Sequence, residues 1–282
     1  MSTIDEFPMA AKMAAEQPEG VPDCIAFPQR FSRGTRLALL AGGLVAGAAG
    51  GLALKGAADP GALWIVVGLA AVAGGLLSTW SPCGWSSISL LRQTGRGTRA
   101  VAGFLPTFAM HGLGYALGAV ILGTLLGALG GIAGFTGFAT TLGLGVLAAI
   151  GLLYGAHQLD LLRLPYPQRR AQVPHDARQR FPKWVVGGLY GLSLGLDYLT
   201  YVQTPLLYMM TAAAILTGNI PEAIGIIALF NLGRFLPVAV NLLPLTDYRI
   251  QSWLGRNQER AAIADGAILT MLGAAFAVLA LA

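Results

Sequence analysis

The stretch STWSPCGWSSIS occupies residues 78–89, inside an apolar run that extends from Gly61 to Leu91. It holds Cys83, one of only two cysteines in the chain. A proline inside a helix removes a backbone hydrogen bond and bends the chain, and in lipid the freed backbone groups need partners from protein or water. Pro82 therefore predicts a break in a helix at membrane depth.

The residues around this break do not by themselves select a chemistry. Hydroxyls, a thiol and two indoles fit a thiol reaction, a polar path through the membrane or simple helix packing. A buried cysteine is most often an inert small hydrophobe, because reactivity requires an accessible thiolate. The candidate site residues in this stretch are Trp80, Ser81, Pro82, Cys83 and Ser86.

Composition identifies an integral membrane protein. Apolar residues make up 55% of the 282 residues and charged residues 11%, and the mean hydropathy is +0.65. The net charge of +5 does not indicate nucleic-acid binding, because the basic residues stand in short loops between apolar runs. Two cysteines and three scattered histidines form no metal-binding motif, and no nucleotide-binding loop is present, so we expect neither a metal nor another cofactor.

The apolar runs predict an all-α fold with seven transmembrane segments. A polar cytoplasmic tail, residues 1–36, is followed by a signal anchor with a short outer loop, residues 37–60. Gly43, Gly47 and Gly51 recur every four residues on this anchor, which suits close helix packing. The remaining divisions are a first group of three segments (61–157), a basic loop (158–183) and a second group of three (184–282). The segments themselves are 37–54, 61–91, 101–131, 135–157, 184–217, 220–243 and 261–282.

The basic residues predict the orientation of the chain. With the N-terminus inside, 16 of the 18 lysines and arginines fall on the cytoplasmic side. Positive charge accumulates on that side of membrane proteins. We therefore expect a multi-pass protein of the bacterial inner membrane with a cytoplasmic N-terminus and a periplasmic C-terminus.

The second and fifth segments are too long to cross the membrane straight. Continuous helices of their length would reach about 45–50 Å, against a hydrocarbon core of about 30 Å. Each carries a hydroxyl-proline step late in its run, Ser81-Pro82 and Thr204-Pro205. Broken helices at equivalent places in two halves are typical of an inverted repeat of three plus three helices. Pro82 and Pro205 should then lie close together near the bundle axis, with Cys83 facing Leu206.

Two further features of the second half are predicted to lie near that centre. Asp197 and Arg234 stand inside apolar segments, where a charge needs a partner, and we expect them to form an ion pair. Tyr201, Gln203 and Thr204 belong to a polar patch before Pro205, which is expected to line the central site.

Three stretches resemble one known family. They are residues 69–93, residues 187–214 (GGLYGLSLGLDYLTYVQTPLLYMMTAAA) and residues 230–243 (FNLGRFLPVAVNLL). They are similar to the first, fourth and fifth helices of the CcdA/DsbD transmembrane thiol-disulfide family, which includes cytochrome c biogenesis proteins. The resemblance implies a six-helix inverted-repeat core that carries reducing equivalents by a cysteine pair, one in helix one and one in helix four.

The chain departs from that family at the second cysteine, because the fourth-helix motif here is Thr204-Pro205-Leu206. One membrane cysteine cannot form the intramolecular disulfide of the relay. With the extra anchor, this pattern resembles the branch of the family that serves methylamine utilisation. That implies a role in the maturation of periplasmic methylamine dehydrogenase, whose small subunit is rich in disulfides. The implied partners are other maturation proteins and periplasmic thiol-disulfide proteins.

Three functions compete at this point. The first is a biogenesis factor, rather than a classical enzyme, in which Cys83 exchanges thiols with a partner protein. The second is a transporter that moves a small solute through the broken-helix centre, and the third is a structural scaffold for maturation factors.

The predicted topology can be tested with reporter fusions. A periplasmic reporter fused after Ala282 is expected to be active, and the same reporter inserted in the loop of residues 158–183 is expected to be inactive. A cytoplasmic reporter should give the opposite pattern, and an exchange of the two results would overturn the seven-segment arrangement.

Overall fold

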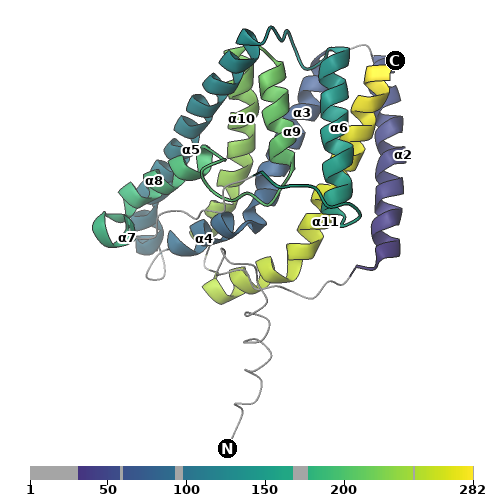
Figure 1. Ribbon diagram of the computed structural model, residues 1–282. Coiled ribbons are helices and arrows are strands. Elements are labelled where there is room, and N and C mark those ends of the chain that lie inside the picture. The colour runs from purple at the N-terminus through teal and green to yellow at the C-terminus, as the bar shows by residue number, and fades with distance from the viewer. Residues whose placement is uncertain (1–30, 58–59, 93–97, 168–176, 244, 282) are drawn as a thin grey trace, which may run out of the picture.

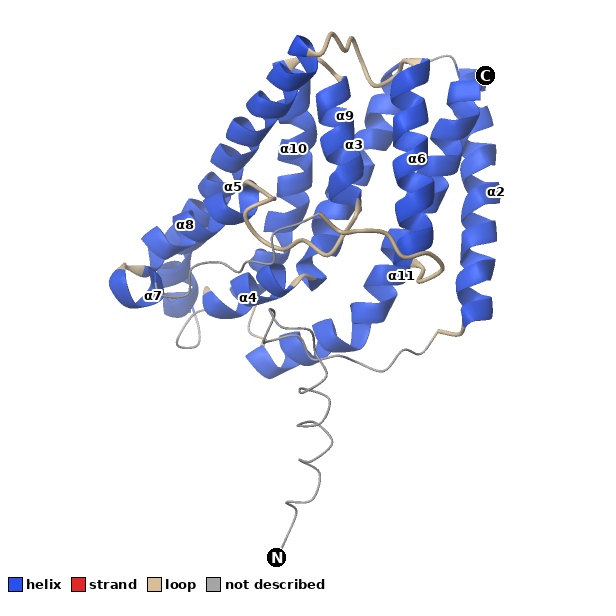
Figure 2. Cartoon of the chain, in the orientation of Figure 1, coloured by secondary structure: helices blue, strands red, loops and turns tan. Residues whose placement is uncertain are grey.

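The structure is a computed structural model that describes residues 31–57, 60–92, 98–167, 177–243 and 245–281. Every regular element in these ranges is a helix (Figure 2). The predicted cytoplasmic tail falls almost wholly outside them, and so does Cys24. The basic loop is described only up to residue 167 and again from residue 177.

The helices follow one another in an order that largely matches the predicted segments (Figure 1). Six of them are long and apolar enough to cross a membrane. The elements are α2 (Arg33–Ala57), α3 (Pro60–Leu77), the 3₁₀ helix η1 (Ser78–Trp80), α4 (Pro82–Leu90), α5 (Thr98–Ile132), α6 (Thr141–Gln158), α7 (Ala177–Arg180), α8 (Lys183–Gly195), α9 (Leu206–Leu216), α10 (Ile220–Phe235), the 3₁₀ helix η2 (Leu236–Leu242) and α11 (Asp247–Leu281).

The two over-long segments are both interrupted. The second is divided into α3, η1 and α4, and the fifth is divided into α8 and α9, with residues 196–205 between them outside any helix. The 13 residues of α8 and the 11 residues of α9 correspond to about 20 and 17 Å of helix. Neither half spans the hydrocarbon core alone, so the fifth crossing is discontinuous.

The last helix begins earlier than the sequence predicts. A polar linker is expected up to residue 260, whereas α11 already starts at Asp247. Hydropathy detects only the portion of a helix that lies in lipid, and this first portion is polar. It lies at the end of the bundle where α2 also begins (Figure 1).

The long helices pack side by side in pairs (Figure 1). α3 packs against α10, α5 packs against both α8 and α10, and α6 packs against α11. Glycines make this close approach possible. A Cβ on Gly75 of α3 would lie 2.0 Å from the carbonyl oxygen of Phe230, and one on Gly233 of α10 would lie 2.2 Å from that of Val72. Only residues without a side chain let the two backbones come so near.

The N-terminal anchor α2 attaches to the bundle through α11. The four-residue glycine spacing serves close packing, as predicted, because a Cβ on Gly47 would lie 2.1 Å from the carbonyl oxygen of Met271. At the start of α2, Arg36 forms an ion pair with Glu259 of α11, with an N–O distance of 2.9 Å.

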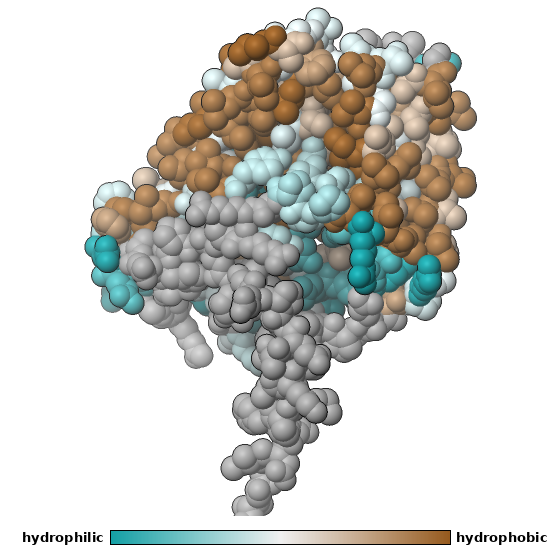
Figure 3. All heavy atoms as spheres, viewed as in Figure 1, coloured by the Kyte–Doolittle hydropathy of each residue, from teal (hydrophilic) through white to brown (hydrophobic). Residues whose placement is uncertain are grey.

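The surface separates an apolar body from a polar end. Hydrophobic residues cover most of the visible sides of the bundle, and polar residues gather near the end where α2 begins (Figure 3). Arg33, Arg99, Lys183 and Arg249 lie in the first turn of α2, α5, α8 and α11, all of which begin at that end (Figure 1). We call it the basic end. This distribution is consistent with a multi-pass membrane protein.

The α2–α11 contact predicts a position-specific effect of one methyl group. Gly47→Ala should push the two helices apart, and overpacking of this kind costs about 1–3 kcal/mol. We expect a lower unfolding midpoint of the purified protein and lower abundance in membranes. Gly50→Ala is the matched control, because a Cβ there meets nothing within 4 Å. Equal destabilisation by both changes would contradict the packing described here.

Candidate functional site

The interruption of the fifth segment, residues 196–205, is the second break, and it begins with an unusual backbone conformation. Asp197 has a φ of 51°, in the left-handed region. Aspartate occupies this region more readily than most residues, and one left-handed residue after the last turn commonly ends a helix. Asp197 thus both ends α8 and carries a charge into the interior.

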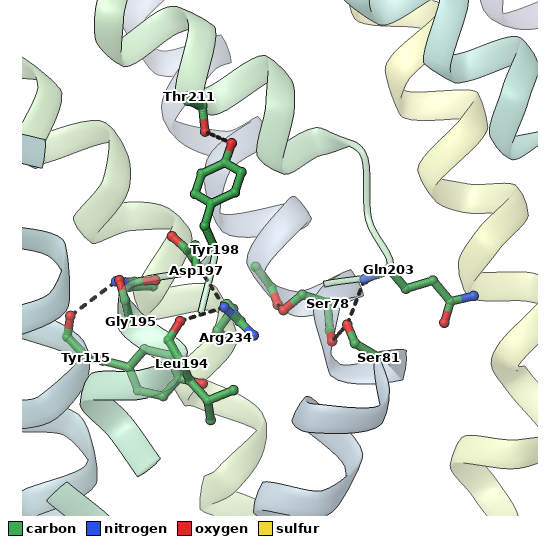
Figure 4. Close-up of polar contacts among 12 residues, drawn as sticks. Ser78, Ser81, Tyr115, Leu194, Gly195, Asp197, Tyr198, Gln203, Thr211 and Arg234 are labelled. Carbon is green, nitrogen blue, oxygen red and sulfur yellow. Dashed lines mark hydrogen bonds and ion pairs between the residues drawn. The ribbon is translucent and has the colours of Figure 1, made fainter. Parts of the chain in front are cut away.

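Side chains from α10 satisfy the backbone carbonyls at this helix end (Figure 4). Arg234 Nη1 donates to the carbonyl oxygen of Leu194 at 2.7 Å. Asn231 Nδ2 donates to the carbonyl oxygens of Gly195 at 2.9 Å and Tyr115 at 3.1 Å. The last carbonyls of a helix have no partner within it, and in lipid they cannot turn to water. Asn231 and Arg234 therefore make a helix end possible inside the bundle.

Asp197 and Arg234 are in direct contact, as the sequence predicts. Arg234 Nη1 lies 2.6 Å from Asp197 Oδ1, and the two residues are 4% and 0% exposed. Because both charges are withdrawn from water, removing either one leaves the other buried without compensation. The pair joins α10 to the beginning of the second break.

The interruption of the second segment, residues 78–81, is the first break, and it lies beside the second. Ser81 Oγ donates to the carbonyl oxygen of Ser78, and it accepts a hydrogen bond of 3.0 Å from the backbone N–H of Gln203 (Figure 4). Pro82 then occupies the first turn of α4, where the missing N–H of proline has no cost. The two breaks are thus joined by a buried hydroxyl next to Pro82.

Cys83 follows the first break and is completely buried. It packs with a cluster that includes Phe104 and Tyr115 of α5 and Tyr190 of α8. Leu206 belongs to a different cluster and contacts the region of Gly74 and Phe230. The expectation that Cys83 faces Leu206 is therefore not met, because α4 changes direction at the first break and carries Cys83 towards α5 and α8.

The remaining predicted site residues lie around the two breaks but have separate partners. Trp80 Nε1 donates to the carbonyl oxygen of Leu254 on α11 at 2.9 Å. Ser86 is half-buried on α4. Thr204 donates to Asp265 Oδ1 of α11 at 2.5 Å. Tyr201 is half-buried, and its ring centre lies 6.1 Å from that of Tyr166.

Sequence reasoning missed Asp265, Asn231 and Tyr166. Tyr166 follows α6, and its hydroxyl donates to the carbonyl oxygen of Gln203 at 2.5 Å. Burial raises the pKa of Tyr166 well above its ordinary value, so the hydroxyl remains a donor. Asp265 carried a usable signal, because it is an acidic residue inside a predicted segment. Nothing in the sequence marks Tyr166, whose loop folds back onto the second break.

Metal ligands do not gather anywhere in the described ranges: no three histidine, cysteine or acidic side chains there could hold one ion. The reactive groups that the described residues bring to the site are the Cys83 thiol, the Asp197–Arg234 ion pair and the buried Asp265 carboxyl group.

Together, the helical bundle and its two polar breaks define a multi-pass helical membrane protein with a discontinuous centre. No family model matches the chain, and no solved structure matches it.

Curated relatives match it along nearly its whole length. It is 74% identical over 282 residues to the methylamine utilization protein MauF of Paracoccus versutus, covering all of both chains. It is 74% identical to the MauF of Paracoccus denitrificans, covering 93% of this chain and 94% of that protein. It is 55% identical to the MauF of Methylorubrum extorquens, covering 93% and 92%. The chain belongs to the MauF family of methylamine utilization proteins.

The ion pair predicts a specific pattern of rescue. Arg234→Ala should cost about 3–5 kcal/mol, because it leaves Asp197 buried and unpaired, and should lower the abundance of the protein in membranes. Asp197→Asn combined with Arg234→Gln should recover part of that loss, since two neutral amides can still bond to each other and to Leu194. If the double variant is no more abundant than the worse single variant, the two residues do not depend on each other.

Proposed function

We propose that this protein supports the maturation of periplasmic methylamine dehydrogenase from the bacterial inner membrane, and that Cys83 does so by thiol-disulfide exchange with a partner protein. The observation that carries the proposal is the position of Cys83, in the first turn of α4 directly after the first break and beside the junction of two broken segments. The names of the relatives supply the methylamine context.

We also propose that residues 61–282 form a CcdA/DsbD-like core of two inverted halves. The helix pairs support this assignment. In an inverted repeat, α3, α5 and α6 of the first half correspond to α8, α10 and α11 of the second half, and each helix contact in one half should have a counterpart in the other. α3 packs on α10, and its counterpart α8 packs on α5. The pairs α5–α10 and α6–α11 each join one helix to its own counterpart in the other half, as a two-fold relation between the halves requires. In such folds the broken helices at equivalent places form the functional centre.

A single cysteine is sufficient for disulfide rearrangement. The Cys83 thiol gives its proton to water, and the thiolate attacks one sulfur of a partner disulfide, which forms a mixed disulfide and releases one partner thiolate. A second partner thiolate then attacks the mixed disulfide at the partner's sulfur and releases the Cys83 thiolate, which takes up a proton from water again. The partner's disulfides are rearranged with no net oxidation, so no second membrane cysteine is needed.

The burial of Cys83 adds a conformational requirement. The thiol is enclosed by the aromatic cluster with Phe104 and Tyr190, and a buried thiol is unreactive until water reaches it. Exchange therefore requires α4 to separate from α5 and α8. The short α4 follows α3 through η1, and its movement would also have to break or carry along the hydrogen bond from Asn241 Nδ2 of η2 to the carbonyl oxygen of Ile88.

The decisive variant is Cys83→Ser, which replaces sulfur by oxygen with little change in volume. In cells that depend on this protein for methylamine growth, we expect normal membrane abundance of the variant and no active methylamine dehydrogenase in the periplasm. Cys24→Ser is the matched control and should retain activity. Acid quenching and thiol blocking should trap a mixed disulfide with the wild type and with Cys24→Ser.

The same variant distinguishes the competing functions. Full dehydrogenase activity in the abundant Cys83→Ser protein, with no trapped disulfide, would reject thiol exchange and favour a scaffold or a transporter. Uptake of labelled small solutes into vesicles containing that variant would then separate those two.

A further inference from the structure

A second buried carboxyl group lies on the other side of the second break. Asp265 of α11 is 1% exposed. Its Oδ1 accepts the hydrogen bond from the Thr204 hydroxyl at 2.5 Å. Its Oδ2 has no hydrogen-bond partner among the described residues. One oxygen is therefore held in place while the other is left with an unused bonding site.

Asp265 differs from Asp197 in having no cationic partner. Asp197 is paired with Arg234, whereas no lysine or arginine of the described ranges forms an ion pair with Asp265. An ionised carboxylate is very costly in an apolar interior unless a charge or several donors compensate it. One threonine hydroxyl is not enough compensation for a carboxylate, so the Asp265 carboxyl group must bind a positive charge, which is either a proton or a cation.

The unpartnered oxygen belongs to a residue that lines a small polar cavity. The cavity lies between the end of α6, the second break and α11, and has a volume of about 10 Å³. That is room for roughly one water molecule. Its polar lining consists of Gln158, Gln203, Thr204, Gln258 and Asp265. Amide groups of this kind can bond a water, and the space is too small for a larger solute.

We propose that Asp265 is a proton-binding site, a neutral carboxylic acid that carries its proton on Oδ2 and exchanges it with water in this cavity. The Thr204 hydroxyl donates to Oδ1 and so leaves Oδ2 as the position for the proton. Deprotonation leaves a carboxylate on Asp265 and passes the proton to the cavity water. The proposal concerns a group that the Cys83 chemistry does not use, and it stands whether or not thiol exchange occurs.

The charged and titratable groups on the surrounding elements leave this assignment intact. Arg36 of α2 bonds to Glu259 and to the carbonyl oxygen of Leu159. His157 at the end of α6 accepts a hydrogen bond from the backbone N–H of Leu164 through Nδ1. The hydroxyl of Tyr166 in the following loop donates to the carbonyl oxygen of Gln203, and the rings of Tyr201 and Tyr208 pack against the Tyr166 ring. The other charged residues of this part of α11 are Arg256 and Arg260, which bond within their own helix.

Thr204 has a second hydrogen bond besides the one to Asp265. Thr204 Oγ1 also accepts a hydrogen bond of 3.3 Å from the backbone N–H of Leu206, at the first turn of α9. The Thr204 side chain therefore bonds both to Asp265 of α11 and to the backbone where the second break ends and α9 begins.

Infrared spectroscopy of the full-length protein in lipid bilayers tests the assignment directly. A protonated carboxyl group gives a C=O stretching band apart from those of carboxylates and amides. We expect such a band to disappear in Asp265→Asn, which has the same shape and no proton to lose. It should remain in Glu222→Gln, the matched control at an exposed carboxyl group. Thr204→Val should move the band to higher frequency, because it removes the hydrogen bond to Oδ1.

Two measurements on the unaltered protein complete the test. Transfer to D₂O should shift the band to lower frequency, since the cavity water exchanges the proton, and raising the pH should diminish it. The absence of any Asp265-dependent band at every pH at which the protein stays folded would overturn the proposal. So would loss of the band on adding Na⁺ at constant pH, which would indicate a metal-cation site, or a band that D₂O leaves unchanged.

Discussion

The constraint on which the structure depends is that a backbone interrupted inside a membrane must find partners for its freed polar groups. At the end of α8 these partners come from α10, where Arg234 bonds to the carbonyl oxygen of Leu194 and Asn231 bonds to that of Gly195. Asp197 then balances the charge of Arg234. The end of α8 therefore depends on the side chains of α10, which link the position of that helix to the discontinuous fifth crossing.

Close packing of the long helices follows from a second physical limit. Between helices in lipid there is little hydrophobic driving force, and association relies on close van der Waals contact. Gly75 and Gly233 bring α3 and α10 together, and Gly47 does the same for α2 and α11. These contacts hold the frame rigid while residues 78–81 and 196–205 remain outside long helices. Rigid helices around irregular centres are the arrangement from which broken-helix membrane proteins build their sites.

The two buried aspartates near the second break show how environment assigns a role. Asp197 is matched by an arginine and joins two helices, whereas Asp265 is matched by a hydroxyl and a small polar cavity. Asp197 lies in the irregular segment 196–205 and Asp265 bonds to Thr204 of that segment, yet only Asp197 has a compensating charge. A compensated charge is fixed in place, while an uncompensated carboxyl group must change its charge with its surroundings. The segment 196–205 is therefore held at its start by the fixed Asp197–Arg234 ion pair and contacts, near its end, the proton-binding carboxyl group of Asp265.

The sequence by itself determined the class of protein, the apolar segments other than the polar start of α11, and the places of the breaks, because hydropathy and proline act locally or through the membrane. It also predicted the Asp197–Arg234 contact, since two charges in lipid need each other. Only the tertiary structure decided that Cys83 packs against α5 and α8 rather than facing Leu206, and that Tyr166 and Asp265 reach the second break. Those contacts depend on the direction that the chain takes after residues 78–81 and 196–205. Backbone direction after an interruption is set by packing between distant segments, which no local pattern records.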